Sequence, residues 1–177
     1  MKIGVLAVQG AFIEHEHIIE KIGHEVVEIR QRKDLDGIDG IILPGGESTV
    51  QGQLIRKLDM LATIKSLITD GLPTLATCAG LILLAGHIDN DDSIHIGTLP
   101  VTVKRNAYGR QLGSFVRTAP MKGFDKFPMT FIRAPYISSI KDNVDVLAAV
   151  DDRTVAVQYN NQIGLAFHPE LSGDTRI

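Results

Sequence analysis

The only cysteine of the chain lies between a predicted strand and a predicted helix, with small residues around it. The segment Ala76-Thr77-Cys78-Ala79-Gly80 is similar to a nucleophile elbow, the tight turn that projects a reactive side chain above a sheet. The positive end of the following helix favours thiolate over thiol, so Cys78 suits nucleophilic chemistry. A buried cysteine that acts only as a small apolar side chain is the alternative interpretation.

A histidine and a glutamate follow the apolar segment 164–167 as His168-Pro169-Glu170. Proline favours an extended conformation for the residue before it, and in an extended chain residues i and i+2 lie on one side. We therefore expect Glu170 to accept a hydrogen bond from one imidazole nitrogen, which leaves the other free to take a thiol proton. A surface histidine at a strand end is the alternative.

Backbone donors are the third chemical feature. Pro44-Gly45-Gly46-Glu47-Ser48-Thr49 follows an apolar strand, and its two glycines let the backbone turn sharply and expose N–H groups. Ser48 or Thr49 is suited to cap the next helix. The N–H groups of Ala79 and of Gly45 or Gly46 are the expected oxyanion hole. An ordinary tight turn is the alternative, and the Gly-Lys-Ser/Thr ending of a phosphate loop is absent.

The remaining histidines carry weaker signals. His15 and His17 lie among glutamates in the first predicted helix, which indicates a solvated helix face. His24, His87 and His95 lie in predicted turns or helix ends, with no carboxylate at motif spacing.

Strand-like and helix-like segments, which must position these motifs, alternate in the first half of the chain. This alternation predicts β-α-β units and a mostly parallel sheet with helices on both faces. Later strand-like segments with short turns predict antiparallel or mixed pairing, with a hairpin at Asn160-Asn161. Ligands bind at the carboxyl ends of such parallel strands, where all three motifs are expected. The expected strands are 2–8, 25–29, 40–43, 73–76, 99–103, 112–116, 129–132, 144–149, 154–159 and 162–167, and the expected helical segments are 12–22, 48–69 (one helix or a broken pair) and the start of one at 79–86.

Composition narrows the function classes. The 177 residues carry a formal net charge of −3, so no large basic field attracts nucleic acid or anionic lipid. One cysteine excludes a disulfide framework and a cysteine-rich zinc site, and we expect no metal. The apolar run 79–86 is too short to span a bilayer. The apolar segment 3–8 lacks the features of a signal peptide, which indicates a cytoplasmic protein with a buried first strand.

An elbow cysteine with a later His-x-Glu resembles the class I, triad-type glutamine amidotransferases. A longer set of segments, in the same order and spanning nearly the whole chain, resembles the glutaminase subunits of pyridoxal 5′-phosphate synthases. Within it, the segments Arg-Asn-x-x-Gly-Arg-Gln and Phe-Ile-Arg-Ala-Pro separate this group from amidotransferases of the histidine, guanine and anthranilate pathways. The set comprises Val8-Gln9-Gly10, 44–49, Thr77-Cys78-Ala79-Gly80, 105–111, Phe131-Ile132-Arg133-Ala134-Pro135 and His168-Pro169-Glu170-Leu171.

The resemblance implies a flavodoxin-like, three-layer α/β domain over residues 1–177, without the final C-terminal helix that the family usually has. It also implies hydrolysis of L-glutamine to L-glutamate and ammonia, with no cofactor. The ammonia would pass by a protected route to a partner synthase subunit, in a large hetero-oligomer. That subunit builds pyridoxal 5′-phosphate from a pentose phosphate and a triose phosphate.

Carried over position by position, the resemblance makes Cys78 the nucleophile and completes the triad with His168 and Glu170. The matching glutamine contacts are Gly46, Glu47, Ser48, Arg105, Ile132 and Arg133. Glutamine is a zwitterion, so Arg105 or Arg133 suits its carboxylate, while Glu47 suits its ammonium. For Arg105 and Arg110, a solvated surface charge is the alternative. One departure is Ala76, where the family more often has glycine.

Two other functions fit parts of the pattern. Another elbow-cysteine hydrolase, of the deglycase or chaperone type, depends on a carboxylate from an early strand end. Here that strand ends in Gln9-Gly10, which argues against this chemistry. A non-catalytic flavodoxin-like binding module is the second alternative, and it gives Cys78 no chemical role.

Overall fold

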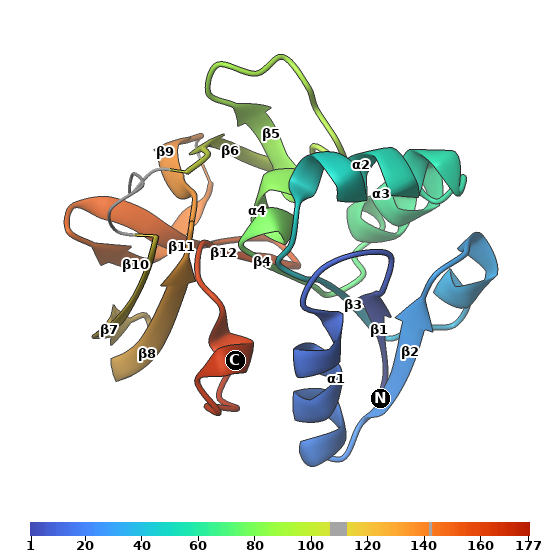
Figure 1. Ribbon diagram of the computed structural model, residues 1–177, viewed down its shortest axis with the longest axis horizontal. Coiled ribbons are helices and arrows are strands. Elements are labelled where there is room, and N and C mark those ends of the chain that lie inside the picture. The colour runs from blue at the N-terminus through green and yellow to red at the C-terminus, as the bar shows by residue number, and fades with distance from the viewer. Residues whose placement is uncertain (107–112, 142) are drawn as a thin grey trace.

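The computed structural model describes residues 1–106, 113–141 and 143–177, and Figure 1 shows how their helices and strands are arranged. The helices are α1 (Phe12–Lys21), α2 (Ser48–Lys57), α3 (Leu61–Thr69) and α4 (Ala79–Leu84), with the short 3-10 helices η1 (Arg32–Leu35) and η2 (Pro169–Leu171). The strands are β1 (Lys2–Leu6), β2 (Glu25–Ile29), β3 (Gly40–Leu43), β4 (Thr74–Thr77), β5 (Ala85–Ile88), β6 (Leu99–Lys104), β7 (Ser114–Met121), β8 (Phe124–Ile132), β9 (Tyr136–Ile140), β10 (Asp145–Val150), β11 (Arg153–Tyr159) and β12 (Gln162–Leu165).

The main sheet begins with five parallel strands in the order β2-β1-β3-β4-β12. A parallel strand between two helical layers is apolar at consecutive positions rather than at alternate ones. The strand β3 meets this condition, because all four of its residues are buried. The helix α1 lies on one side of these strands, and α2, α3 and α4 lie on the other (Figure 1). The predicted α/β fold class with helix, sheet and helix layers is therefore confirmed.

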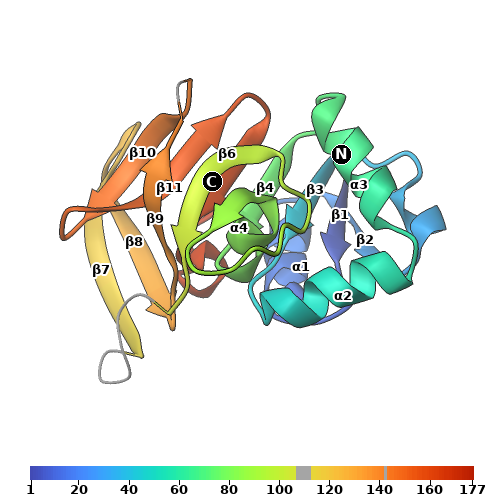
Figure 2. The same ribbon diagram turned by 90° about the horizontal axis from the view of Figure 1, so that it is seen from above.

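The second half of the chain extends this sheet with mostly antiparallel strands, in the order β12-β11-β9-β6-β5, and β10 pairs with β11. The strands β5 and β6 are parallel. The expected hairpin is present, since β11 and β12 are antiparallel neighbours joined at Asn160 and Asn161. Figure 2 shows the mixed part beside the helix-covered part. The strands β7 and β8 form a separate two-stranded sheet.

The structure differs from the sequence-based expectations at several element boundaries. The expected helical segment 48–69 is a pair, because Asp59 takes a left-handed backbone (φ 52°) between α2 and α3. The expected helix 79–86 ends at Leu84, where the backbone extends into β5. The strand β9 was not predicted, since its serines weaken the apolar signal. Residue 112 of one expected strand lies outside the described residues.

Aromatic packing connects the hairpin of β7 and β8 to the end of β12. Phe131 and Phe127 on β8 pack against Phe167, with ring centroids 5.8 and 6.1 Å apart, and all three side chains are fully buried. Next to this cluster, the backbone N–H of His168 donates to the carbonyl of Thr130 at 2.8 Å. The hairpin therefore fixes the backbone of the residue that follows β12.

The predicted elbow lies where β4 meets α4. Cys78 has φ 48° and ψ −101°, a strained conformation for a residue with a side chain. Its N–H donates to the carbonyl of Leu165 on β12 at 2.8 Å. A Cβ atom on Gly80 would lie 2.0 Å from the carbonyl oxygen of Leu43 on β3. Only glycine lets the start of α4 approach β3 this closely, so small residues are required here as expected.

Among the helices in the described part of the chain, none combines the length and the apolar character needed to cross a bilayer. The expectation of one domain over residues 1–177 stays a prediction.

We predict that Gly80→Ala destabilises the protein by about 1–3 kcal/mol, because the added methyl group forces α4 away from β3. The measurement is the free energy of unfolding from denaturant titration. Gly113→Ala is the matched control, since nothing lies within 4 Å of a Cβ at that position. Equal stabilities of the two variants would contradict the close approach of α4 to β3.

Candidate active site

A cavity of about 480 Å³ opens at the carboxyl ends of the parallel strands. Each of four neighbouring strands contributes a lining residue just beyond its end: Gln9 after β1, Gly45 after β3, Cys78 after β4 and His168 after β12. Parallel strands place their carboxyl ends at one edge, which explains why segments distant in sequence meet here. The three motifs expected at this edge do lie together.

Cys78 and His168 are paired in this cavity. The Cys78 side chain is mostly buried, and its Sγ lies 3.9 Å from the carbonyl oxygen of Ile132. Cys78 and His168 both line this cavity, and Cys78 is among the groups that raise the pKa of His168. The sulfur is thus next to a base and is not enclosed in hydrocarbon.

Glu170 holds the other side of the imidazole. Nδ1 of His168 lies 2.6 Å from Oε1 of Glu170, and both residues are 6% exposed. This contact is the one predicted from the sequence, but a different backbone conformation produces it. His168 is close to extended, whereas Pro169–Leu171 turns as η2 and brings Glu170 back toward the ring. Since Nδ1 faces Glu170, Nε2 remains for the thiol.

The electrostatics of this group favour a protonated His168. Burial lowers the pKa of His168, but hydrogen bonds and opposite charge from Cys78 and Glu170 outweigh it and raise the pKa to about 10. At neutral pH His168 is therefore an imidazolium. Its positive charge lies beside the sulfur of Cys78, in the cavity that both residues line.

The glycine turn after β3 packs directly on the imidazole. A Cβ on Gly45 would lie 2.3 Å from Cε1 of His168, so no larger residue fits without moving the ring. The carbonyl of Gly45 accepts a hydrogen bond of 2.9 Å from the N–H of Ala11. The side chain of Gln9 accepts from the N–H of Glu47 at 2.9 Å. These contacts fix the turn beside Cys78.

Glu47 is the helix cap of α2, a role expected of Ser48 or Thr49. Its carboxylate accepts hydrogen bonds from the N–H groups of Thr49 at 3.2 Å and Val50 at 2.8 Å. The expectation failed because Ser48 is already the first residue of the helix. Burial raises the pKa of Glu47, but these hydrogen bonds and the nearby Arg105 outweigh that effect, so the pKa lies below its ordinary value.

Two arginines, Arg105 and Arg133, also line the cavity. Arg105 pairs with Asp91 through Nη1 at 3.1 Å, while its Nε and Nη2 atoms are buried and have no hydrogen-bond partner within the described residues. A buried, unpartnered guanidinium edge is suited to an anionic group of a ligand. Arg133 follows Ile132 and takes a left-handed backbone with φ 42°.

The structure brings nearly all of the predicted site residues to this cavity. Glu170 is the exception, since it lies behind His168 and lines a neighbouring apolar cavity. Arg110 and Gln111 of the predicted motif lie outside the described residues. Within the described residues, no group of histidine, cysteine and carboxylate side chains is arranged to hold a metal ion. The predicted residues that line the cavity are Gly45, Gly46, Glu47, Ser48, Cys78, Ala79, Arg105, Ile132, Arg133 and His168.

Sequence reasoning missed two residues near the site. Gln9 belonged to a noted motif, but it was given no role. His15 was expected on a solvated helix face, and this was wrong: it is 4% exposed and its Nε2 lies 3.5 Å from Oε2 of Glu170. The available signal was helical spacing, because His15 precedes the buried Ile19 by four residues.

We predict that Cys78→Ala lowers the pKa of His168, because the variant removes a hydrogen bond and a charge that favour the imidazolium. Proton and nitrogen NMR of the imidazole across pH measures the change. In the wild type, the raised pKa adds stability that is complete below pH about 6.5 and is lost as the pH rises through about 10. An unchanged titration midpoint in the variant would contradict the pairing.

The chain is similar to known proteins along its whole length. The pyridoxal 5′-phosphate synthase subunit PdxT of Desulfitobacterium hafniense (strain DSM 10664 / DCB-2) is 58% identical over 178 residues, which cover 100% of this chain and 89% of that protein. The subunit of the same name from Streptococcus pneumoniae (strain CGSP14) is 50% identical over 181 residues, covering 100% and 93%.

Solved structures agree with these sequences. A crystal structure of a glutamine amidotransferase superposes with a TM-score of 0.94 at 38% identity, covering 98% of this chain and 93% of that one. The structure of PurLQS from Thermotoga maritima shares the fold, with a TM-score of 0.71 at 19% identity over 96% of this chain and 87% of the matched one. Residues 5–177 match the SNO glutamine amidotransferase family along their whole length. The chain therefore belongs to the SNO glutamine amidotransferase family.

Proposed function

We propose that this chain is the glutaminase subunit of a pyridoxal 5′-phosphate synthase. It hydrolyses L-glutamine to L-glutamate and ammonia and supplies the ammonia to a synthase subunit for vitamin B6 synthesis. The observation that carries the proposal is the placement of Cys78 and His168 in one cavity at the carboxyl ends of the parallel strands, with Glu170 against the imidazole of His168. The two PdxT relatives, at 58% and 50% identity, support the assignment to pyridoxal 5′-phosphate synthesis.

The first half of the reaction forms a covalent intermediate. The thiolate of Cys78 attacks the side-chain amide carbon of glutamine, and the N–H groups of Ala79 and of Gly45 or Gly46 stabilise the resulting oxyanion. His168, which is protonated at neutral pH, gives its proton to the departing ammonia. A γ-glutamyl thioester on Cys78 remains.

The second half releases glutamate. Water enters and gives a proton to His168, which now acts as the base, and hydrolysis of the thioester regenerates the thiolate of Cys78 and the protonated imidazole. Glu170 keeps the imidazole in one orientation through both halves, because its Oε1 holds Nδ1 throughout. Nε2 is then the nitrogen that exchanges protons with sulfur, ammonia and water.

The charged ends of glutamine need partners in the same cavity. The unpartnered Nε and Nη2 of Arg105 suit the α-carboxylate, with Arg133 beside it. Glu47 is a candidate partner for the ammonium, since carboxylate oxygens that cap a helix retain further lone pairs. The Ser48, Gly46 and Ile132 positions complete the proposed substrate contacts.

The turn at Gly45 and Gly46 is where a partner protein can regulate the reaction. A peptide places its C=O and N–H groups on opposite sides, so a flip of the Gly45–Gly46 peptide exchanges a donor for an acceptor at the oxyanion. Loss of one such donor costs about 2.7–4 kcal/mol of transition-state stabilisation. A glutaminase that idles in the flipped state and is switched on by the synthase would not waste glutamine.

The proposal also covers the domain organisation of the chain and its location in the cell. Residues 1–177 are proposed to form one glutaminase domain that acts in the cytoplasm within a large hetero-oligomer with the synthase. Neither a membrane nor a nucleic acid is a proposed partner. The deglycase alternative finds little support, because the residue that follows β1 into the cavity is Gln9 rather than a carboxylate.

We predict that Cys78→Ala lowers glutamate release by roughly 10³-fold or more, because the variant has no nucleophile. The assay measures glutamate with and without the synthase. A glutamine-mimicking electrophile should label wild-type protein at Cys78 and leave the variant unlabelled. Undiminished glutamate release by the variant would favour a non-catalytic module. Equal wild-type rates with and without the synthase would refute the proposed regulation at the Gly45–Gly46 turn but not the glutaminase activity.

We also predict that Arg105→Gln raises the KM for glutamine by roughly 10-fold to 100-fold with little change in kcat, because a charge-assisted contact to the α-carboxylate is lost. Glutaminamide, which lacks that carboxylate, should be affected much less. Arg32→Gln is the matched control, because Arg32 pairs with Asp59 at an exposed site outside the cavity. An equal loss for both substrates would argue against the assigned contact.

A further inference from the structure

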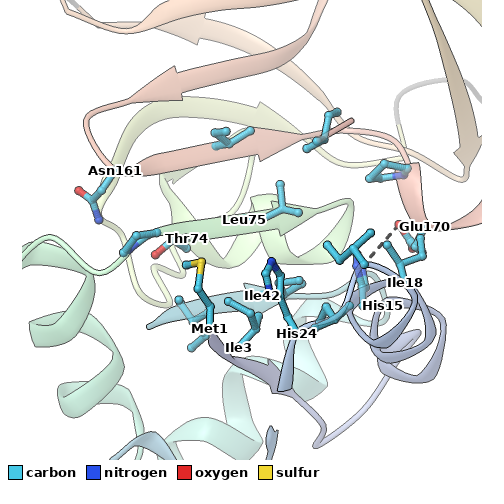
Figure 3. A pocket seen from close by; sticks show the side chains of 18 of the residues that line it. Met1, Ile3, His15, Ile18, His24, Ile42, Thr74, Leu75, Asn161 and Glu170 are labelled. Atoms are coloured by element: carbon cyan, nitrogen blue, oxygen red, sulfur yellow. Dashed lines mark ion pairs between the residues drawn. The ribbon is translucent and has the colours of Figure 1, made fainter. Parts of the chain in front are cut away.

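A second buried histidine faces the triad from behind. His15 lies on α1 and is 4% exposed, although it is surrounded in sequence by charged residues. Figure 3 shows its side chain pointing from the helix toward Glu170, at the end of an apolar cavity of about 430 Å³. The proposed mechanism gives this residue no role. Its burial therefore needs an explanation from its own contacts.

Those contacts join two parts of the site. The Nε2 atom of His15 lies 3.2 Å from Oγ1 of Thr77, the residue directly before the nucleophile. The same atom lies 3.5 Å from Oε2 of Glu170. One imidazole nitrogen thus faces both the strand that carries the elbow and the carboxylate that orients His168.

The carboxylate of Glu170 is satisfied on one side only. Oε1 is engaged with His168 at 2.6 Å, while Oε2 is buried and accepts no hydrogen bond from the described residues. A buried carboxylate oxygen without a donor costs free energy. Nε2 of His15 lies about 0.5 Å beyond an ordinary hydrogen bond, a gap of the kind that closes when a site binds its substrate.

The protonation of His15 follows from its surroundings. Burial lowers the pKa of His15, and the nearby His168 lowers it further, whereas Glu170 and Glu14 raise it by less. His15 is therefore neutral at neutral pH and carries one ring proton. An ionised carboxylate only accepts hydrogen bonds, so the nitrogen that faces Glu170 is the one that bears the proton.

We propose that His15 is a positioning residue of the triad: its Nε2–H holds Oε2 of Glu170, so that Oε1 stays directed at Nδ1 of His168. The proposal rests on the proposed glutaminase function, in which Glu170 orients the base. The helix α1 then helps to position a triad residue. The contact of His15 with Thr77 holds α1 against the strand that carries the elbow.

The test compares three variants in the complex with the synthase. His15→Leu keeps similar volume but removes the donor, His15→Gln retains an amide N–H near the position of Nε2, and His17→Gln changes an exposed histidine on the same helix. We expect His15→Leu to lower kcat roughly 10-fold or more, with KM within about twofold. His15→Gln and His17→Gln should stay within about threefold of the wild type in kcat.

A second readout does not depend on activity. The Nδ1 proton of His168, in its short hydrogen bond to Glu170, should give a downfield proton NMR resonance in the wild type, His15→Gln and His17→Gln. It should be lost or moved upfield in His15→Leu. If His15→Leu does not fold, His15→Asn replaces it, because the shorter amide cannot reach Oε2 and should lose the same resonance and rate.

Two results would overturn the inference: wild-type kcat and resonance in His15→Leu, or equal losses in His15→Gln and His15→Leu, which would indicate a purely structural role. A failure of the proposed function looks different. In that case the wild type itself does not hydrolyse glutamine with the synthase present, while the resonance of His168 still reports whether His15 positions Glu170.

Discussion

The imidazole of His168 is the group on which the rest of the site depends. It is buried between a sulfur and a carboxylate, and it stays charged because the two favourable neighbours outweigh the cost of burial. A charge in this position is stable only while both neighbours keep their places. The scaffold must therefore hold Cys78, His168 and Glu170 in fixed relation.

The fold meets this requirement with short, close contacts. The elbow places Cys78 against β12 through its backbone, and the absence of a side chain on Gly80 lets α4 approach β3. The hairpin of β7 and β8 holds the backbone of His168 through Thr130. Gly45 packs on the imidazole ring of His168, so the glycine turn is in direct contact with the base. Regulation of that turn by a partner would act directly on the chemistry.

Much of this arrangement could be predicted from the sequence, because it rests on local rules. Continuous apolar runs identified the parallel strands, and small residues around Cys78 identified the elbow. Parallel strands share a carboxyl edge, so the motifs were expected to meet. The contact between His168 and Glu170 was also predicted, although η2 rather than an extended chain produces it.

What could not be predicted depends on tertiary contacts. His15 is surrounded by glutamates, and although helical spacing puts it on the same side as Ile19, only the packing of α1 against η2 shows that it contacts Glu170. Glu47 caps α2 because Ser48, one of the two expected caps, is already the first residue of the helix. The strand β9 pairs with β6 and β11 despite weak apolar character, since its neighbours supply the hydrogen bonds.

The central claim is that the sulfur, the imidazole and the backbone donors converge on one reacting carbon. The most direct measurement is a crystal structure of the synthase-bound protein after reaction with a glutamine-mimicking electrophile. We expect a bond to Sγ of Cys78, a hydrogen bond from the N–H of Ala79 to the adduct oxygen, and Nε2 of His168 within hydrogen-bond distance of the adduct. An adduct on another residue, or an imidazole turned away from the sulfur, would contradict it.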